Sequence, residues 1–332
     1  MKPVNVLEDN FGRQIEYVRL AVTDRCNLRC QYCMPAQGIA IVERKELLTY
    51  KEMYRIVRVL TELGVKKVRL TGGEPFVRKD FMGFLDTLSH NDLLDEINIT
   101  TNGALIAKYI EKLEQLKVGS INLSIDSLQR EKFAKITRRD VFEEVFETFQ
   151  KLNESSLQLK LNVVVQAGLN IDEIYDFIEL SKDNEISVRF IEEMPFNGDG
   201  KRADSELWNY KAIINHIEKE YANLEKVESE KSSTSINFKV PGYKGSFGII
   251  PAYTRSICGD CNRIRITSTG MLKNCLFDGG VFNVRDYIRN GASNEDLKAL
   301  FLKLVKLKPA NGFVAEANRD NEVSESMSTI GG

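Results

Sequence analysis

The sequence has no excess of either charge, no long apolar run and no apolar stretch at its start. Lys and Arg number 46 against 48 Asp and Glu, a net charge of −2 over 332 residues. This balance argues against non-specific binding of nucleic acid or of an anionic membrane surface. No apolar run approaches the roughly 20 residues of a membrane-spanning helix, and the first residues lack the apolar stretch of a signal peptide. We therefore expect a cytoplasmic protein with neither a nucleic-acid nor a membrane partner.

Histidine is scarce, with two residues in the chain, whereas the six cysteines are concentrated in two triplets with none between them. The triplets are Cys26, Cys30 and Cys33, and Cys258, Cys261 and Cys275. A protein without an export signal keeps such residues as thiols. Clustered cytosolic thiols favour metal binding or catalysis over disulfide bonds.

The first two thirds of the chain alternate between strand-like and helix-like runs. The strands are expected at residues 17–22, 67–71, 96–100, 120–125, 159–165 and 187–191, and the helices at 49–63, 81–88, 104–116, 141–152 and 171–181. This alternation of six units predicts a parallel sheet with right-handed crossovers. Six units fall short of the eight of a closed barrel, so we expect an α/β fold with an open, partial TIM-type barrel.

The pattern changes at the polar stretch 227–235, which predicts an exposed loop or a boundary. We therefore divide the chain into a barrel domain, 1–225, and a C-terminal α+β region, 226–332. Short strands are expected at 247–250 and 263–267, the latter forming a hairpin with 271–276. An amphipathic helix is expected at 293–306, and the chain from Asn311 onward is expected to be polar and mobile.

The first triplet follows the first predicted strand, which places it in a loop at the mouth of the barrel. Three thiolates at this spacing suit three irons of a 4Fe–4S cluster, because such clusters need soft thiolate ligands. With no fourth cysteine nearby, one iron keeps an open coordination site. A structural zinc site is the alternative, but zinc requires four ligands, and neither His90 nor His216 is close in sequence.

The Cys-x3-Cys-x-Tyr-Cys pattern resembles the radical S-adenosylmethionine superfamily. The resemblance implies that the open iron binds the methionine part of S-adenosylmethionine, whose cleavage yields a 5′-deoxyadenosyl radical. It also implies cofactor contacts from Tyr32, which precedes the last cysteine of the triplet, and from Gly73, Ser124 and Met194, which lie at or just after strand ends. Gly73 belongs to a TGGEP segment after the second predicted strand, where a residue without a Cβ lets the backbone approach a ligand.

The second triplet also supplies three ligands, and two arginines follow it. Arg263 and Arg265 are two residues apart on a predicted strand, so both side chains point to one face. Two guanidinium groups beside a cluster suit phosphate binding, although isolated arginines on a strand are more often solvated. We expect a second 4Fe–4S cluster whose open iron binds substrate.

Over nearly its whole length the chain is similar to the GTP 3′,8-cyclase family, which acts first in molybdenum cofactor biosynthesis. The matching segments are Asp9 with 11–13, 19–27, 30–35, 69–75, 100–103, 124–127, 258–265, 275–276 and 330–332. The resemblance implies conversion of GTP into (8S)-3′,8-cyclo-7,8-dihydroguanosine 5′-triphosphate, with guanine at the second cluster. It implies GTP contacts from Arg19, Arg69, Thr100, Lys160, Arg263 and Arg265.

The resemblance further implies that Gly331 and Gly332 reach into the active site, that an external electron donor exists, and that the chain forms a homodimer. Glu325 departs from the pattern, because a basic residue is expected before Met327. No role is assigned to Lys67.

Three alternatives stay open from the residues alone. A peptide-modifying enzyme of the same superfamily would carry more C-terminal cysteines than this chain has. An electron-transfer protein would carry closed clusters with four ligands each. A zinc module for nucleic acid disagrees with both the net charge and the number of ligands.

Overall fold

The computed structural model describes residues 6–198, 208–228, 233–255, 258–319 and 325–331. Within these residues the strands form a twelve-stranded sheet in the order β12-β11-β10-β1-β2-β3-β4-β5-β6-β9-β8-β7. Its centre consists of parallel strands: β1 (Tyr17–Thr23), β2 (Lys67–Gly72), β3 (Glu96–Thr101), β4 (Val118–Ser124), β5 (Gln158–Val165) and β6 (Ser187–Glu192). The predicted open, partial barrel of six β/α units is confirmed.

The C-terminal strands extend this sheet at both edges. They are β7 (Glu225–Val227), β8 (Ile236–Lys239), β9 (Ser246–Ile250), β10 (Arg263–Ile266), β11 (Met271–Lys273) and β12 (Phe282–Asn283). β10 pairs parallel with β1, and β9 pairs parallel with β6. The predicted hairpin is present as the antiparallel pair β10 and β11. The described sheet is therefore continuous across residue 225, although the two-domain division itself stays a prediction.

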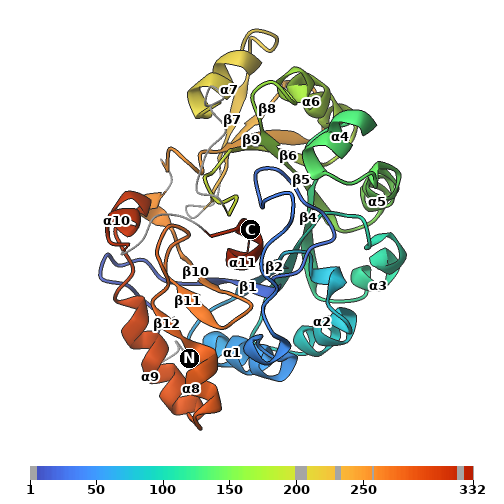
Figure 1. Cartoon of the computed structure of the whole chain (residues 1–332). Coiled ribbons are helices and arrows are strands. Elements are labelled where there is room, and N and C mark those ends of the chain that lie inside the picture. The colour runs from blue at the N-terminus through green and yellow to red at the C-terminus, as the bar shows by residue number, and fades with distance from the viewer. Residues whose placement is uncertain (1–5, 199–207, 229–232, 256–257, 320–324, 332) are drawn as a thin grey trace.

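Helices cover the outer face of the sheet and surround the ring of strands (Figure 1). They are α1 (Tyr50–Glu62), α2 (Phe81–Ser89), α3 (Ile110–Glu114), α4 (Arg130–Thr137), α5 (Phe142–Glu154) and α6 (Ile174–Asp183). α1 begins with a capping box between Thr49 and Glu52. α4 was not predicted, and the helix predicted at 104–116 is shorter, because its first part is a 3-10 turn, Ala107–Tyr109.

The remaining helices are α7 (Tyr210–Ile217), α8 (Val284–Arg289), α9 (Asn294–Val305), α10 (Gly312–Ala317) and α11 (Met327–Ile330). The prediction of a mobile chain from Asn311 onward is wrong for the described residues. The Asn311 side chain caps α10, and Ile330 of α11 is buried in an apolar cluster with Phe196 and Phe277. Figure 1 shows α11 in the middle of the ring of strands. None of the described helices combines the length and apolar character needed to cross a membrane.

Alternation along the strands separates the core from the cavity. On β5, Leu159, Leu161 and Val163 are buried in the main core, whereas Lys160 and Asn162 line a cavity on the other face. Burying a side chain such as leucine contributes about 1.5–3 kcal/mol, so the apolar face fixes the register. That register determines which polar side chains point inward.

Candidate active site

A cavity of about 1030 Å³ lies inside the ring of strands, and residues of both cysteine triplets line it. The first triplet occupies the loop after β1, whereas Cys258 and Cys261 precede β10 and Cys275 follows β11. Because β10 pairs with β1, segments more than 200 residues apart meet at one opening. All six cysteines are free thiols.

The thiols of the first triplet are buried and lie near carboxylates, and both effects raise their pKa values. Burial raises the pKa of Cys26 to about 11 and that of Cys33 to about 12, with Glu74 contributing at Cys26 and Asp126 at Cys33. The amide of Leu28 donates to Cys26 Sγ at 3.4 Å. These thiols therefore hold their protons until a metal replaces them.

The predicted cofactor contacts lie around the same loop. The Tyr32 hydroxyl donates to Asp126 Oδ2 at 2.8 Å, and Ser124 and Met194 line the cavity. Gly73 packs against the backbone carbonyl of Arg25, where a Cβ would collide. The structure thus brings Tyr32, Gly73, Ser124 and Met194 to one cavity, while their roles stay predictions.

Glu74 carries no predicted role, although it belongs to the TGGEP segment. Its buried carboxylate accepts hydrogen bonds from the amides of Asn102 and Phe76 and from the Thr101 hydroxyl, at 2.7, 3.1 and 2.9 Å. Burial raises its pKa to about 7, while those bonds oppose the rise. Glu74 therefore joins the ends of β2 and β3 beneath the first triplet, a role that only the tertiary structure reveals.

Cations surround the second triplet instead. Burial alone would raise the pKa of Cys261, but Lys308 and Arg263 lower it to about 7. The Cys275 amide donates to Asp278 Oδ2 at 2.7 Å, which fixes the turn after β11. Three His, Cys, Asp or Glu side chains able to ligate a single metal ion are not found together among the described residues. In a 4Fe–4S cluster each thiolate instead binds its own iron.

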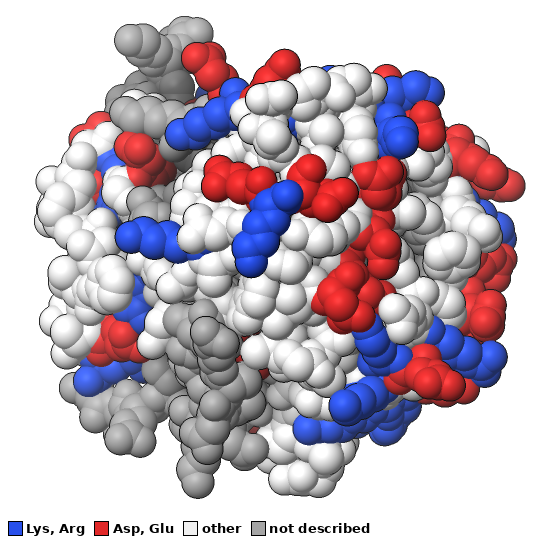
Figure 2. Space-filling model, turned by 90° about the horizontal axis from the view of Figure 1, so that it is seen from above, with Lys and Arg blue, Asp and Glu red and all other residues white. Residues whose placement is uncertain are grey.

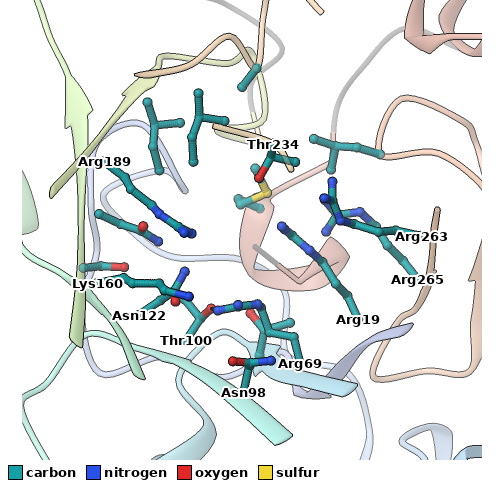
Figure 3. Close-up of a pocket in the computed structure, with 18 of the residues that line it drawn as sticks. Arg19, Arg69, Asn98, Thr100, Asn122, Lys160, Arg189, Thr234, Arg263 and Arg265 are labelled. Atoms are coloured by element: carbon teal, nitrogen blue, oxygen red, sulfur yellow. Dashed lines mark hydrogen bonds between the residues drawn. The ribbon is translucent and has the colours of Figure 1, made fainter. Parts of the chain in front are cut away.

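Strand register explains how the predicted GTP contacts meet. Arg19 pairs in register with Arg265 on one side and with Arg69 on the other. Alternation then places Arg263 one step further along the face, and Lys160 enters from β5. Figure 3 shows Arg19, Arg263 and Arg265 side by side, facing Lys160 and Arg189 across the cavity. Thr100 accepts from Arg69 Nη1 at 3.4 Å.

Among the described residues, Arg19, Lys160 and Arg189 form no ion pair with a carboxylate. Burial and neighbouring arginines hold the pKa of Arg19 well below its usual value, and burial lowers that of Lys160 to about 8. The Nε atoms of Arg19 and Arg189 are buried without a hydrogen-bond partner among the described residues. On the outer face in Figure 2, acidic and basic side chains are instead interspersed. The cavity is thus prepared for an anionic ligand.

Two further basic residues, Arg189 and Lys67, line the same cavity, and the sequence analysis assigned a role to neither. Arg189 on β6 was missed, although it alternates with buried Val188 and Phe190 as Lys160 alternates on β5. The alternation of polar and buried residues along β6 could have identified Arg189 from the sequence. Lys67, which had no assigned role, lines the cavity and forms an ion pair with Glu96 at 3.2 Å.

Residues 325–331 lie against both halves of the site. The Ser326 hydroxyl donates to the Cys33 carbonyl at 2.7 Å, and the Gly331 carbonyl accepts from Arg265. Gly331 has a φ of +85°, and a Cβ there would lie 3.0 Å from side-chain atoms of Ala21 and Thr71.

Two further predictions concern this segment. Glu325, where a basic residue was expected, pairs with buried Lys273 at 2.8 Å and with Arg319 at 2.9 Å. Gly332 lies outside the described residues, so the structure says nothing of its predicted role.

An open parallel sheet with a three-cysteine loop after its first strand defines a radical S-adenosylmethionine protein, and comparison with known proteins agrees. Residues 20–181 match the radical SAM superfamily, and residues 186–314 match the family described as Molybdenum Cofactor Synthesis C. A structure of Streptococcus suis SuiB, 15% identical, covers 88% of this chain and 67% of its own with a TM-score of 0.60, which supports the fold alone.

Curated relatives define the family more narrowly. GTP 3′,8-cyclase of Peptoclostridium acidaminophilum is 41% identical over 92% of this chain and 93% of that protein. GTP 3′,8-cyclase of Desulforamulus reducens is 37% identical over 98% and 99%. This chain belongs to the GTP 3′,8-cyclase family. Superfamily membership makes S-adenosylmethionine and iron–sulfur clusters its cofactors.

Other relatives are much longer. Molybdenum cofactor biosynthesis protein 1 of Mus musculus is 41% identical over 88% of this chain but 46% of that protein. The chain spans about half the length of this relative and of the related proteins of Bos taurus and Homo sapiens.

Proposed function

We propose that the chain converts GTP into (8S)-3′,8-cyclo-7,8-dihydroguanosine 5′-triphosphate, the first step of molybdenum cofactor biosynthesis. The observation that carries this proposal is one cavity that both three-thiol sites and a group of buried cations line together. Relatives named GTP 3′,8-cyclase support the same assignment.

The residues of the first site fit a 4Fe–4S cluster with S-adenosylmethionine. Cys26, Cys30 and Cys33 would hold three irons, which leaves one iron for the cofactor. When bound, these groups supply a carbon-centred radical that removes the hydrogen atom from ribose C3′. The chain itself orients the cofactor through Gly73, whose backbone is accessible at the cavity wall, and through Tyr32, which Asp126 holds in place.

The cations would bind the triphosphate. Arg19, Arg263 and Arg265 present neighbouring guanidinium groups, which suit bidentate contacts with phosphate oxygens. Their buried setting strengthens each contact, because little water competes for the charge. Guanine would lie at Cys258, Cys261 and Cys275, whose open iron would bind the base.

Residues 325–331 would exclude water from the cavity. Met327 lines it, and the Gly331 carbonyl holds Arg265 in place. Excluding water protects a reactive radical and strengthens the electrostatic contacts. We propose that Gly331, together with Gly332, positions the phosphate-binding arginines.

The test is formation of 5′-deoxyadenosine by anaerobically reconstituted, dithionite-reduced protein with each nucleoside triphosphate in turn. Strong stimulation by GTP alone, together with a cyclised guanine nucleotide, supports the proposal. If S-adenosylmethionine is cleaved but no nucleotide changes the rate, the assignment of the first site stands and the assignment of GTP as substrate is wrong. A peptide-modifying activity is the competing assignment, and it predicts stimulation by a peptide instead.

Several finer assignments remain our predictions. The thiol content favours a cytoplasmic location, and the chemistry requires an external electron donor. A homodimer and a boundary near residue 225 rest on the resemblance and on the polar stretch at 227–235.

A further inference from the structure

Lys308 is a buried cation beside the second triplet, and none of the roles assigned above uses it. It follows α9 and is 4% exposed. Its ammonium group donates to the backbone carbonyls of Arg263, at 2.7 Å, and Asn274, and it lies 3.7 Å from Cys261 Sγ. An ammonium group has three N–H donors, so these three acceptors use all of them.

The three acceptors belong to the segments that build the second site. Cys261 is itself a predicted ligand, Asn274 directly precedes the ligand Cys275, and Arg263 begins the strand that carries the phosphate-binding arginines. Lys308 therefore fixes the separation between the β10 and β11 sides of the site.

The charge of Lys308 has no carboxylate partner among the described residues. Buried Lys273, by contrast, pairs with Glu325 at 2.8 Å. Burying an ammonium group without a counter-charge is unfavourable, because the charge loses its hydration. The Cys261 thiol, which can carry negative charge, lies 3.7 Å away, and Lys308 acts to lower the pKa of Cys258, Cys261 and Cys275, against the effect of burial.

We propose that Lys308 is the counter-charge of the second cluster, donating an N–H···S hydrogen bond to the Cys261 ligand and raising the reduction potential of that cluster. Reduction adds negative charge to the cluster, so a nearby cation favours the reduced form. Hydrogen bonds to a ligand sulfur act in the same direction. This inference rests on the proposed function, because it requires a cluster at the second triplet.

The test is an EPR-monitored redox titration of the full-length chain with its first triplet replaced by alanine, so that only the second cluster contributes. Lys308→Gln removes the charge, Lys308→Arg retains it, and Lys306→Gln removes an exposed charge two residues away. We expect Lys308→Gln to lower the reduced-to-oxidised ratio about tenfold at a fixed potential, which is about 59 mV for one electron. Lys308→Arg and Lys306→Gln should resemble the parent.

An unchanged potential in Lys308→Gln with its iron retained would overturn the proposal. If Lys308→Gln fails to assemble the cluster and Lys308→Arg succeeds, the charge is required for assembly, which supports it. If both variants fail to assemble the cluster, a second measurement, made on protein without a substitution, tests the proposal.

That measurement uses protein grown with 15N-lysine. The N–H···S contact predicts a nitrogen hyperfine coupling to the reduced second cluster, which Lys306→Gln retains. Its absence overturns the proposal. An unsubstituted chain that assembles the first cluster alone would reject the second site and this inference together. A normal second cluster without the coupling rejects the inference alone.

Discussion

The two cysteine triplets supply the same number of thiols but lie in opposite electrostatic surroundings. Near the first triplet, the carboxyl groups of Glu74 and Asp126 add to burial and raise the pKa values of the thiols. Near the second, Lys308 acts to lower the pKa of all three thiols and, with Arg263, brings that of Cys261 to about 7, whereas burial keeps the pKa values of Cys258 and Cys275 raised. Identical ligand sets can therefore be prepared for different chemistry by the charges around them.

This difference matches the tasks that we propose for the two sites. Negative surroundings disfavour adding an electron to a cluster, so they lower its potential and make the reduced form a stronger reductant. Positive surroundings favour an anionic ligand such as a triphosphate. The first site thus suits electron delivery to S-adenosylmethionine, and the second suits substrate binding.

The largest expected effect comes from removing one thiol at each site. Cys33→Ala and Cys275→Ala should each lose one cluster and therefore roughly half of the bound iron. Cleavage of S-adenosylmethionine should fall to background in Cys33→Ala only, while Cys275→Ala should retain the cleavage seen without nucleotide and lose both its stimulation by GTP and the cyclised product. Iron analysis with chromatography of 5′-deoxyadenosine and nucleotides measures both. Loss of cleavage in both variants would contradict the proposal that the first site cleaves S-adenosylmethionine and the second binds substrate.

The next effect separates substrate binding from cofactor cleavage. Arg19→Gln should raise the KM for GTP about a hundredfold, because a charged hydrogen bond to phosphate contributes about 1.5–3 kcal/mol. Cleavage without nucleotide should be unchanged, since Arg19 contacts neither cysteine triplet in our assignment. Arg130→Gln, which removes an exposed arginine paired with Asp140 at 2.9 Å, is the matched control. Equal effects in both variants would contradict a specific role for Arg19.

A smaller effect tests whether the cationic side of the cavity titrates. Burial and the nearby arginines Arg189 and Arg69 lower the pKa of Lys160 to about 8. Below that pH the ammonium group is charged and binds phosphate. Above it, affinity for GTP should fall by up to about tenfold per pH unit, because binding must first restore the proton.

Lys160→Arg keeps its charge throughout this range, so its affinity should stay level between about pH 8 and 9. Equilibrium nucleotide binding measures the effect without involving turnover. Identical pH profiles for the parent and for Lys160→Arg would show that Lys160 does not carry the dependence.

Much of the fold could be predicted because its signals are local. Alternating strand and helix runs predict the six central β/α units, and the helices predicted from Thr49 and from Ser293 each begin with a capping box in the structure. The pairing of β10 with β1 and of β9 with β6 could not be predicted. Sheet order at an edge depends on contacts between segments distant in sequence, for which the sequence has no periodic signal.

The candidate site divides in the same way. Cysteine spacing reveals both triplets, because loops carry their ligands close together in sequence. Glu74 and Lys308 contact partners on other segments, so their roles follow from contacts in the folded structure and not from the residues next to them in sequence. Arg189 is intermediate, since alternation on β6 places it inward, but only the curvature of the open sheet brings it opposite Arg263.

The smallest expected effect concerns the segment that touches both sites. Gly331→Ala places a Cβ 3.0 Å from side chains of Ala21 and Thr71 at a φ of +85°, a backbone conformation that costs alanine about 1 kcal/mol. We expect kcat/KM for GTP to fall about fivefold as Gly331 withdraws from Arg265. Gly242→Ala introduces the same strain at a φ of +84° with no atom within 4 Å of the added Cβ. It should therefore leave kcat/KM unchanged, and a matching fall there would mean that general strain, rather than the position of Gly331 between the two sites, limits the reaction.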